Sequence, residues 1–428
     1  MPLYKNMSKD ELKKIKDELM AEFNKEVTKG NNYSILRGLP SDEMLELSAG
    51  LLSVLKNEED YKSENCYDVR QYGTLEGISE ARQLMSEILE IPKNNVYVGG
   101  VSSLSLMHST LCLAYIHGLY NSPTAWNKLK NIKVLCPAPG YDRHFEMCGY
   151  FGFELVYIPM LSTGPDMGLV EEYVQDECVK AILCVPKFSN PTGVVYCDET
   201  IRRLAKLSPA AKDFVILYDN AYAVHEFDQQ TPINLLPLYN ELSKYGKTNM
   251  AIQYTSTSKI SFPGGGITAI GTGDEQLAHL HKYLSFQRIN FDKINQMRHV
   301  RFYKNLQGIR EHMSKVSDIS RPKFEAVIKV FEKELAPTGI ARWSAPKGGY
   351  FISLDVMEGC ASRVKELSDQ IGLSILPTGS TFPYYKDPKE QNIRIAPTYP
   401  PVSEISEATR LLSLCVNIAA VEKLLLTT

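Results

Sequence analysis

Residues 254–266 read YTSTSKISFPGGG, and Lys259 carries the only charged side chain in this stretch. The run 251–255 before it predicts a buried strand, and the three glycines after it allow the backbone to pack closely. A lysine in such surroundings is poorly hydrated, which disfavours its ammonium form and makes its amine a candidate nucleophile toward a carbonyl group. Taken alone, the stretch is more typical of a plain loop lysine beside a glycine turn. The interpretation therefore depends on what the rest of the chain places around Lys259.

Short apolar runs, each ended by Pro, Asp or Ser, predict the fold around this lysine. They lie at residues 134–136, 181–185, 215–218 and 251–255. Such runs are typical of parallel strands that are buried on both faces. Ligands of parallel sheets collect at the carboxyl ends of the strands. Four polar segments follow the strands directly and are candidate site segments: residues 139–144, 189–193, 219–222 and 256–259.

A fifth segment has the features of an anion site. A short strand at 96–98 is followed by the sequence GGVSS at 99–103 and then by an apolar helix predicted over 104–119. Unpaired backbone N–H groups and the positive end of the helix dipole favour a phosphate at such a helix start. Neither a P-loop lysine pattern nor a complete GxGxxG accompanies it, so nucleotide binding is not indicated.

Each candidate side chain also has an ordinary structural explanation. Asn190 stands in an Asn-Pro-Thr-Gly turn, Asp219 could cap a helix, and Tyr141, His144 and Tyr222 could be core residues. Together, however, these groups indicate a common ligand. One edge of the predicted sheet would hold an acid, aromatic rings, an amide, a lysine and a helix start suited to a phosphate. A phosphorylated heteroaromatic aldehyde would use all of them.

Composition describes an ordinary globular protein. The 428 residues are 44% hydrophobic and 23% charged with a net charge of −3, so no nucleic-acid partner is expected. No apolar run approaches the length of a membrane span, and residues 1–5 lack the apolar core of a secretion signal, so we expect no membrane partner and a cytoplasmic location. Nine scattered cysteines without CxxC spacing predict reduced thiols and no metal site.

Six motifs occur in order along most of the chain: Tyr72-x-x-x-x-Gly77-Ile78-x-Glu80-x-Arg82, Pro139-x-Tyr141-x-x-His144, Asn190-Pro191-Thr192-Gly193, Asp219-x-x-Tyr222, Ser256-x-Ser258-Lys259 and Arg394. This set resembles the class I aminotransferases, which use pyridoxal 5′-phosphate (PLP). The sequences RGxP at 37–40, PGYDRHF at 139–145, SKI at 258–260 and NQxRHVRF at 295–302 resemble the bacterial type Ic aspartate aminotransferases, a branch related to MocR proteins. The implied fold is α/β, PLP-dependent transferase fold type I, with a mainly parallel mixed sheet in the large domain and a smaller α+β domain.

The resemblance implies catalytic roles for three residues. Lys259 would bond to the cofactor aldehyde as a Schiff base, Asp219 would face the pyridine nitrogen, and Tyr222 would donate to the ring oxygen. A carboxylate keeps the ring nitrogen protonated, and a protonated ring accepts the electrons left when the substrate loses its Cα proton. His144 would brace Asp219, and Tyr141 would stack on the ring.

The phosphate and the oligomer follow from the same resemblance. Val101 and Ser102 at the helix start, with Ser256 and Ser258, would hold the phosphate. Tyr72 resembles a tyrosine that reaches this phosphate from the neighbouring subunit, which implies a homodimer with shared active sites.

Substrate contacts are implied at both ends of the chain. Arg394 would pair with the substrate α-carboxylate in bidentate fashion, and Asn190 would contact both that carboxylate and the ring oxygen. Arg37, next to Gly38 in a segment that resembles the family's substrate-covering arm, is the first candidate for a side-chain carboxylate. Three other arginines are available for that role: Arg288, Arg298 and Arg301.

Two positions depart from the family pattern. The broader family places an arginine shortly after the lysine to bind the phosphate, but no arginine occurs here through Ile270. Backbone amides of the glycine run, the helix start, the serines and Tyr72 are the candidates to balance the phosphate charge. Leu39 stands where the type Ic branch often has a lysine.

Three sections are expected along the chain. Residues 1–60 would form an N-terminal helix and arm that belong to the small domain, 61–320 the large PLP-binding domain, and 321–428 the C-terminal small domain. Within them, the capping box Ser8-Lys9-Asp10-Glu11 predicts a helix to about Lys29, and apolar spacing predicts one long helix over about 299–335.

The implied function is an aminotransferase that moves an amino group between an L-amino acid, aspartate, and a 2-oxo acid, 2-oxoglutarate, by a ping-pong mechanism. Another PLP enzyme would keep nearly all of these residues, because the cofactor carries the chemistry. An aminotransferase of different specificity, a C–S lyase and a decarboxylase are therefore alternatives. So is a noncatalytic PLP-binding sensor of the MocR type, although the residues before Arg37 offer one helix where a DNA-binding domain would be needed.

Overall fold

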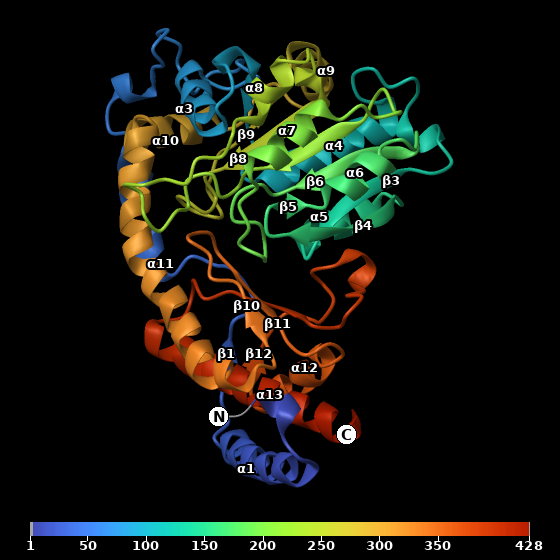
Figure 1. Cartoon of the computed structure of the whole chain (residues 1–428). Helices are drawn as coiled ribbons and strands as arrows, with labels where there is room; N and C mark the ends of the chain where they lie inside the picture. The colour runs from blue at the N-terminus through green and yellow to red at the C-terminus, as the bar shows by residue number, and fades with distance from the viewer. Residues whose placement is uncertain (1–2, 428) are drawn as a thin grey trace.

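The computed structural model describes residues 3–427, so that Met1, Pro2 and Thr428, at the ends of the two outer sections, lie outside the described residues. Figure 1 shows an upper body built around a large sheet and a lower body in which both termini lie. Helix α11 (Leu306–Glu334) runs along one side of the molecule from the upper body to the lower one.

The large sheet of the described chain has eight strands in the order β2-β9-β8-β7-β6-β3-β4-β5. Their bounds are β2 (Val96–Val98), β3 (Lys133–Ala138), β4 (Glu154–Leu161), β5 (Gly164–Pro165), β6 (Val179–Cys184), β7 (Val215–Asp219), β8 (Ala251–Ser256) and β9 (Thr268–Gly271). Strands β4, β3, β6, β7 and β8 are parallel neighbours, whereas β9, β2 and β5 pair antiparallel. The predicted mainly parallel mixed sheet is confirmed, and all four predicted runs lie in it.

Alternating side chains of the central strands point into two different cores. In β6 and β7, Leu183 and Leu217 join one core with residues of α4 (Ser103–His117), α5 (Asp142–Tyr150) and α9 (Asp274–Gln287). Ile182 and Ile216 join the other core with residues of α6 (Met167–Tyr173), α7 (Asp198–Lys206) and α8 (Leu238–Ser243). Since helices cover both faces, the strands need apolar residues at every position, which explains the continuous apolar runs in the sequence.

A third layer packs at the β2 end of the sheet. Helices α3 (Ser79–Leu89), α10 (Lys293–Tyr303) and the start of α11 share a core with Val96 and Val98 of β2. Ile260 and Ile267, which flank the glycine loop after Lys259, belong to the same core. This packing anchors both ends of the glycine loop that follows Lys259.

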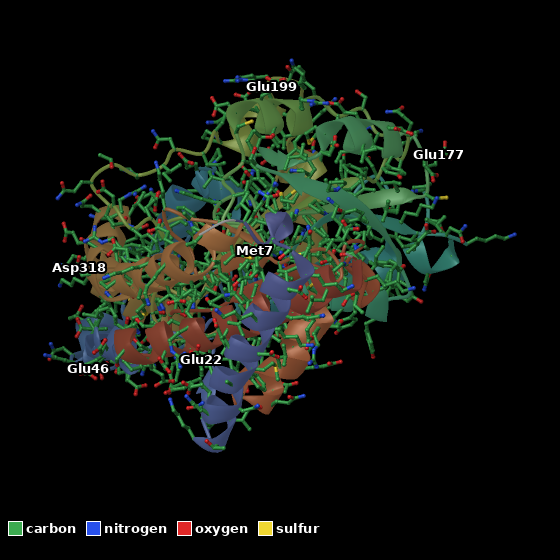
Figure 2. The ribbon with its side chains drawn as sticks, turned by 60° about the horizontal axis from the view of Figure 1, so that its bottom comes forward. Met7, Glu22, Glu46, Glu177, Glu199 and Asp318 are labelled. Carbon is green, nitrogen blue, oxygen red and sulfur yellow. The ribbon has the colours of Figure 1, made fainter. Side chains whose placement is uncertain are left out.

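The lower body combines the two ends of the chain. Strands β10 (Arg342–Trp343), β11 (Ile352–Asp355) and β13 (Asn392–Ile395) form an antiparallel sheet, and β1 (Tyr33–Ser34) pairs with β12 (Leu373–Ser374). Helices α1 (Lys9–Thr28), α12 (Ala361–Gln370) and α13 (Val402–Thr427) complete it. In Figure 2, Glu22 lies on α1 where this helix crosses α13, and Arg410 of α13 bonds the Glu22 carboxylate at 2.6 Å.

Two helix predictions had different outcomes. The capping box is present, since the Ser8 side chain accepts from the N–H of Glu11, and α1 ends at Thr28 as expected. The single long helix over 299–335 is wrong, because the chain leaves helical geometry at Lys304, where φ is 67°, and Asn305 caps a new helix. The apolar spacing continues through the break, so periodicity alone did not reveal it.

The remaining elements are short: α2 (Asp42–Glu46) and the 3₁₀ turns η1 (Tyr4–Asn6), η2 (Ala49–Ser53), η3 (Glu58–Tyr61), η4 (Lys93–Asn95), η5 (Trp126–Lys128), η6 (Thr248–Met250), η7 (Ala336–Thr338) and η8 (Pro383–Tyr385). Between residues 3 and 427, no helix has the length and apolar character that a membrane crossing requires.

Candidate active site

A cavity of about 140 Å³ lies at the carboxyl edge of the large sheet. Its walls come from the start of α4 and from the segments after β3, β6, β7 and β8. Eight predicted site residues line it: Ser102, Tyr141, Asn190, Asp219, Tyr222, Ser256, Ser258 and Lys259. Residues far apart in the sequence meet there because the ends of parallel strands share one edge.

Lys259 lies at the bottom of this cavity. The side chain opens into the cavity, so it is only half-buried by surface area, yet protein surrounds the amine closely enough for desolvation to lower its pKa. The negative charge of Asp219 opposes this pKa shift. The Lys259 Nζ atom lies 5.4 Å from the ring centre of Tyr222 and 5.7 Å from that of Tyr350. Two aromatic rings therefore lie beside the amine.

Asp219 ends β7 and is 4% exposed. Its Oδ2 atom lies 3.2 Å from His144 Nε2 and accepts a hydrogen bond of 3.2 Å from Ser103 Oγ. Its Oδ1 atom is buried and has no hydrogen-bond partner among the described residues. A buried carboxylate oxygen without a donor is costly, so this atom is suited to a ligand that supplies an N–H group.

Two tyrosines line the cavity, Tyr222 and Tyr141. Tyr222 is buried, and desolvation raises its pKa well above the usual value. The ring of Tyr141 meets that of His144 edge-on with centres 4.8 Å apart, and burial raises the pKa of Tyr141 to about 12. Both hydroxyls therefore stay protonated near neutral pH and can donate hydrogen bonds.

The residues predicted to hold a phosphate lie around the start of α4. Ser102 caps this helix by accepting from the N–H of Ser105 at 3.4 Å. The hydroxyls of Ser256 and Ser258 donate to the carbonyl of Val101 at 3.1 and 2.6 Å. A Cβ atom at Gly266 would lie 2.8 Å from the Ser258 nitrogen, so a glycine is required where the loop passes this serine. Val101 itself is 42% exposed and does not line the cavity that contains Lys259.

Arg394 projects from β13 of the lower body and is 6% exposed. Its guanidinium donates to Asp142 Oδ1 at 3.2 Å and Asn190 Oδ1 at 3.4 Å, and it stacks on Phe351 at 4.7 Å. The Nε atom is buried without a partner among the described residues. Arg394 thus holds unused donor capacity beside the cavity residue Asn190.

The two arm residues differ in their surroundings. Gly38 packs on Phe351 so closely that a Cβ atom there would lie 2.6 Å from the ring. Arg37 is exposed, and its side chain makes no hydrogen bond or ion pair within residues 3–427. Gly38 therefore packs on the ring that Arg394 contacts, whereas the Arg37 side chain is exposed.

The other candidate arginines are also placed away from the lysine cavity. Arg288 stacks on Phe291 at 4.1 Å, and Arg301 donates to the carbonyl of Lys62 at 3.1 Å. Arg298 lines a separate cavity of about 390 Å³ beside Gly264, Gly265 and Gly266.

Tyr72 is 77% exposed and does not line the cavity around Lys259. The loop that contains Tyr72 is nevertheless anchored. The Tyr72 carbonyl accepts a hydrogen bond from the Tyr67 hydroxyl, and Lys293 Nζ donates to the Gly73 carbonyl at 2.9 Å. The loop presents the Tyr72 ring outward from a fixed base.

Sequence reasoning assigned no role to four residues of the site: Ser103, Asp142, Tyr350 and Phe351. Each lies one or two positions from a residue that had been singled out or in a segment with a glycine pair, such as PKGGYF at 346–351. Their roles depend on side-chain directions across the two bodies, which local spacing does not fix.

The match to known proteins covers almost the whole chain. The family model of aspartate aminotransferases matches residues 7–427. The aspartate aminotransferase of Corynebacterium glutamicum is 38% identical over 95% of this chain and 94% of its own length. The crystal structure of an aspartate transaminase from that organism superposes with a TM-score of 0.96 at 36% identity and covers 99% of both chains.

A more distant structure shares the fold. An α-aminoadipate aminotransferase from Thermus thermophilus, complexed with N-(5′-phosphopyridoxyl)-L-leucine, has a TM-score of 0.72 at 22% identity over 95% of this chain and 96% of that chain.

Fold and site define a PLP-dependent transferase of fold type I. The chain belongs to the aspartate aminotransferase family, and the protein is an aminotransferase. The residues present fit the family's cofactor, pyridoxal 5′-phosphate: the partnerless Asp219 oxygen suits the ring nitrogen, the Lys259 amine suits the aldehyde, and the start of α4 suits the phosphate.

Proposed function

We propose that this aminotransferase moves the amino group of L-aspartate to 2-oxoglutarate by a ping-pong mechanism. The observation that carries the assignment of an amino-acid substrate is Arg394, a buried guanidinium with an unused Nε donor beside Asn190. A planar guanidinium suits a carboxylate that binds through two oxygens. The choice of aspartate is supported by the names of the relatives from Corynebacterium glutamicum.

In this proposal Lys259 moves the proton. When bound, PLP supplies an aldehyde carbon that carries the amino group and a ring that withdraws electrons from the substrate Cα. Because desolvation lowers the pKa of Lys259, a larger fraction of its amine is unprotonated and able to accept the Cα proton. The rings of Tyr222 and Tyr350 lie beside the amine that accepts the proton.

Asp219 and Tyr222 complete the catalytic set. Asp219 Oδ1 would hold a proton at the ring nitrogen, and His144 contacts the other carboxylate oxygen, Oδ2, at 3.2 Å. The Tyr222 hydroxyl would donate to the ring oxygen, with Asn190 as a second contact. Tyr141 would stack on the ring.

The start of α4 would hold the phosphate, with Val101 and Ser102 contributing backbone N–H groups. Ser256 and Ser258, whose hydroxyls donate to the Val101 carbonyl here, would redirect them to the phosphate. We propose that Tyr72 of a second subunit completes this site in a homodimer. Support comes from the outward-facing ring of Tyr72, which is 77% exposed, and from the apolar side chain of Val101 beside the helix cap, which is 42% exposed.

Arg37 remains our candidate for the aspartate side-chain carboxylate. It has no competing partner within residues 3–427, and neighbouring Gly38 already contacts Phe351, the ring on which Arg394 stacks. An inward turn of the Arg37 side chain would place both substrate carboxylates between the arm and β13.

We also propose the domain division 1–60 and 321–428 for the small domain and 61–320 for the large one. The pairing of β1 with β12 and the packing of α1 on α13 support a small domain made from both ends. Within 1–60, the arm segment from α2 to η2 packs against α10 and α11 and so links the small domain to the large one. All nine cysteines are free, which supports the proposal of a cytoplasmic location.

The test is a steady-state assay with a panel of amino donors and 2-oxo acids, in which oxaloacetate is measured by coupled reduction. Aspartate with 2-oxoglutarate should give the highest kcat/KM, and double-reciprocal plots should be parallel. Release of pyruvate with sulfide, or of carbon dioxide, would instead assign a C–S lyase or a decarboxylase.

A further inference from the structure

Ser103 occupies a position that the proposed catalytic set does not explain. It is the first residue of α4, is 8% exposed and lines the cavity that contains Lys259. Its hydroxyl donates to Asp219 Oδ2 at 3.2 Å. Since an ionised carboxylate only accepts hydrogen bonds, the serine must be the donor.

The direction of the Ser103 hydroxyl is unusual for this helix. Ser109 and Thr110 of α4 donate to the carbonyl four residues earlier, at 3.1 and 3.0 Å. Ser103 makes no such bond, and Asp219 is its only side-chain acceptor within residues 3–427. At the first position of the helix, its hydroxyl is free to point across to β7.

Two helices therefore meet at one carboxylate oxygen. Ser103 of α4 and His144 of α5 each lie 3.2 Å from Oδ2, whereas Oδ1 has no partner within the described chain. Contacts from two different helices fix the plane of the carboxylate and leave Oδ1 directed to the ligand.

We propose that Ser103 is a positioning residue that holds the Asp219 carboxylate oriented toward the ring nitrogen of PLP. This inference rests on the proposed role of Asp219. Because Ser102 caps the same helix at the proposed phosphate site, the first turn of α4 then fixes both ends of the cofactor, the phosphate through its backbone and the ring nitrogen through Ser103 and Asp219.

The test compares Ser103→Ala, Ser103→Thr and Ser103→Cys holoenzymes, with Ser109→Ala as the matched control. Ser109 lies in the same helix and bonds only to the carbonyl of Ser105. Four quantities are measured: kcat, the KM for aspartate, the dissociation constant of PLP, and the pH midpoint of the visible cofactor band.

Ser103→Ala should lower kcat and weaken PLP binding by about tenfold each, the effect expected for one hydrogen bond to a charged group, with little change in the KM for aspartate. The band midpoint should move to higher pH, because a less firmly protonated ring nitrogen leaves less positive charge beside the lysine-bound cofactor. Ser103→Thr keeps the hydroxyl and should restore kcat, PLP affinity and the band midpoint to wild-type values. Ser109→Ala should match the wild type.

A wild-type kcat and a wild-type band midpoint in Ser103→Ala would overturn the proposal. Equal losses in the Ala and Thr variants would also overturn it, because they would assign the effect to side-chain packing and not to the hydroxyl. If Ser103→Ala does not fold, Ser103→Cys decides: its thiol keeps the volume but donates weakly, so wild-type behaviour would overturn the proposal and an intermediate loss would support it. Absence of a cofactor band or of transamination in the wild type would be a failure of the proposed function instead.

Discussion

Arg394 is the residue on which substrate recognition depends. Arg394→Lys replaces the planar guanidinium with a point charge. It should raise the KM for every amino-acid substrate by about 10- to 100-fold, the effect of losing one or two charge-assisted hydrogen bonds.

Arg37→Ala should raise the KM for aspartate and leave the KM for alanine unchanged, because Arg37 is assigned to the side-chain carboxylate. Initial-rate kinetics with both substrates separates the two roles, and an equal rise for alanine in Arg37→Ala would contradict that assignment.

The protonation of Lys259 gives a prediction with a definite sign. Desolvation lowers the pKa of Lys259 below the ordinary 10.5, and the negative charge of Asp219 partly offsets this decrease. The unprotonated amine is therefore populated at a lower pH than in a free lysine, and removing the Asp219 charge should lower the midpoint further.

The measurement is the rate at which apoenzyme incorporates PLP, followed against pH in the wild type and in Asp219→Asn. The midpoint should lie below 10.5 in the wild type and lower still in the variant. An upward shift in Asp219→Asn would show that Asp219 does not stabilise the ammonium form of Lys259.

At the scale of elements, the break between α10 and α11 stores backbone strain at Lys304. Its φ of 67° favours glycine, so Lys304→Gly should stabilise the protein by roughly 0.5 to 1 kcal/mol. Lys315→Gly, at an exposed position inside α11, should destabilise it by about 1 kcal/mol. Urea unfolding of both variants checks the opposite signs, and destabilisation by Lys304→Gly would contradict this explanation of the break.

The same break shows what the sequence could predict at this scale. Strands β3, β6, β7 and β8 were predictable because burial on both faces demands unbroken apolar runs. The end of α10 was not, because the apolar face continues past Lys304 and the break depends on one backbone angle. Asn305 and Gly308 were the available signs, since the Asn305 side chain accepts from the N–H of Gly308 at 3.0 Å.

At the scale of the molecule, the site is assembled from both ends of the chain. Lys259, Asp219 and Asn190 could be predicted because each follows a strand of one sheet. The contacts of Asp142 and Phe351 with Arg394 could not, because they join α5 of the upper body to β13 and the segment before β11 in the lower one. No local pattern encodes how the two bodies face each other.

The proposed dimer makes a prediction about mixed subunits. Lys259→Ala and Tyr72→Phe should each be impaired alone, whereas a mixed dimer would contain one site with both native residues. Refolding the two variants together should restore activity toward one quarter of the wild-type value, since random pairing makes half of the dimers mixed and each has one of two sites intact. Activity no higher than the sum of the separate variants would contradict a site shared through Tyr72.

The most direct test of the central claim is the absorbance of the PLP-loaded protein between about 300 and 500 nm in the two half-reactions. Addition of aspartate alone should bleach the visible band with release of one oxaloacetate per site, and subsequent 2-oxoglutarate should restore the band with release of glutamate. Lys259→Ala should show neither change at a comparable rate. A wild-type band that aspartate leaves unchanged would contradict the assignment of aspartate, and failure to take up PLP would contradict the proposed site as a whole.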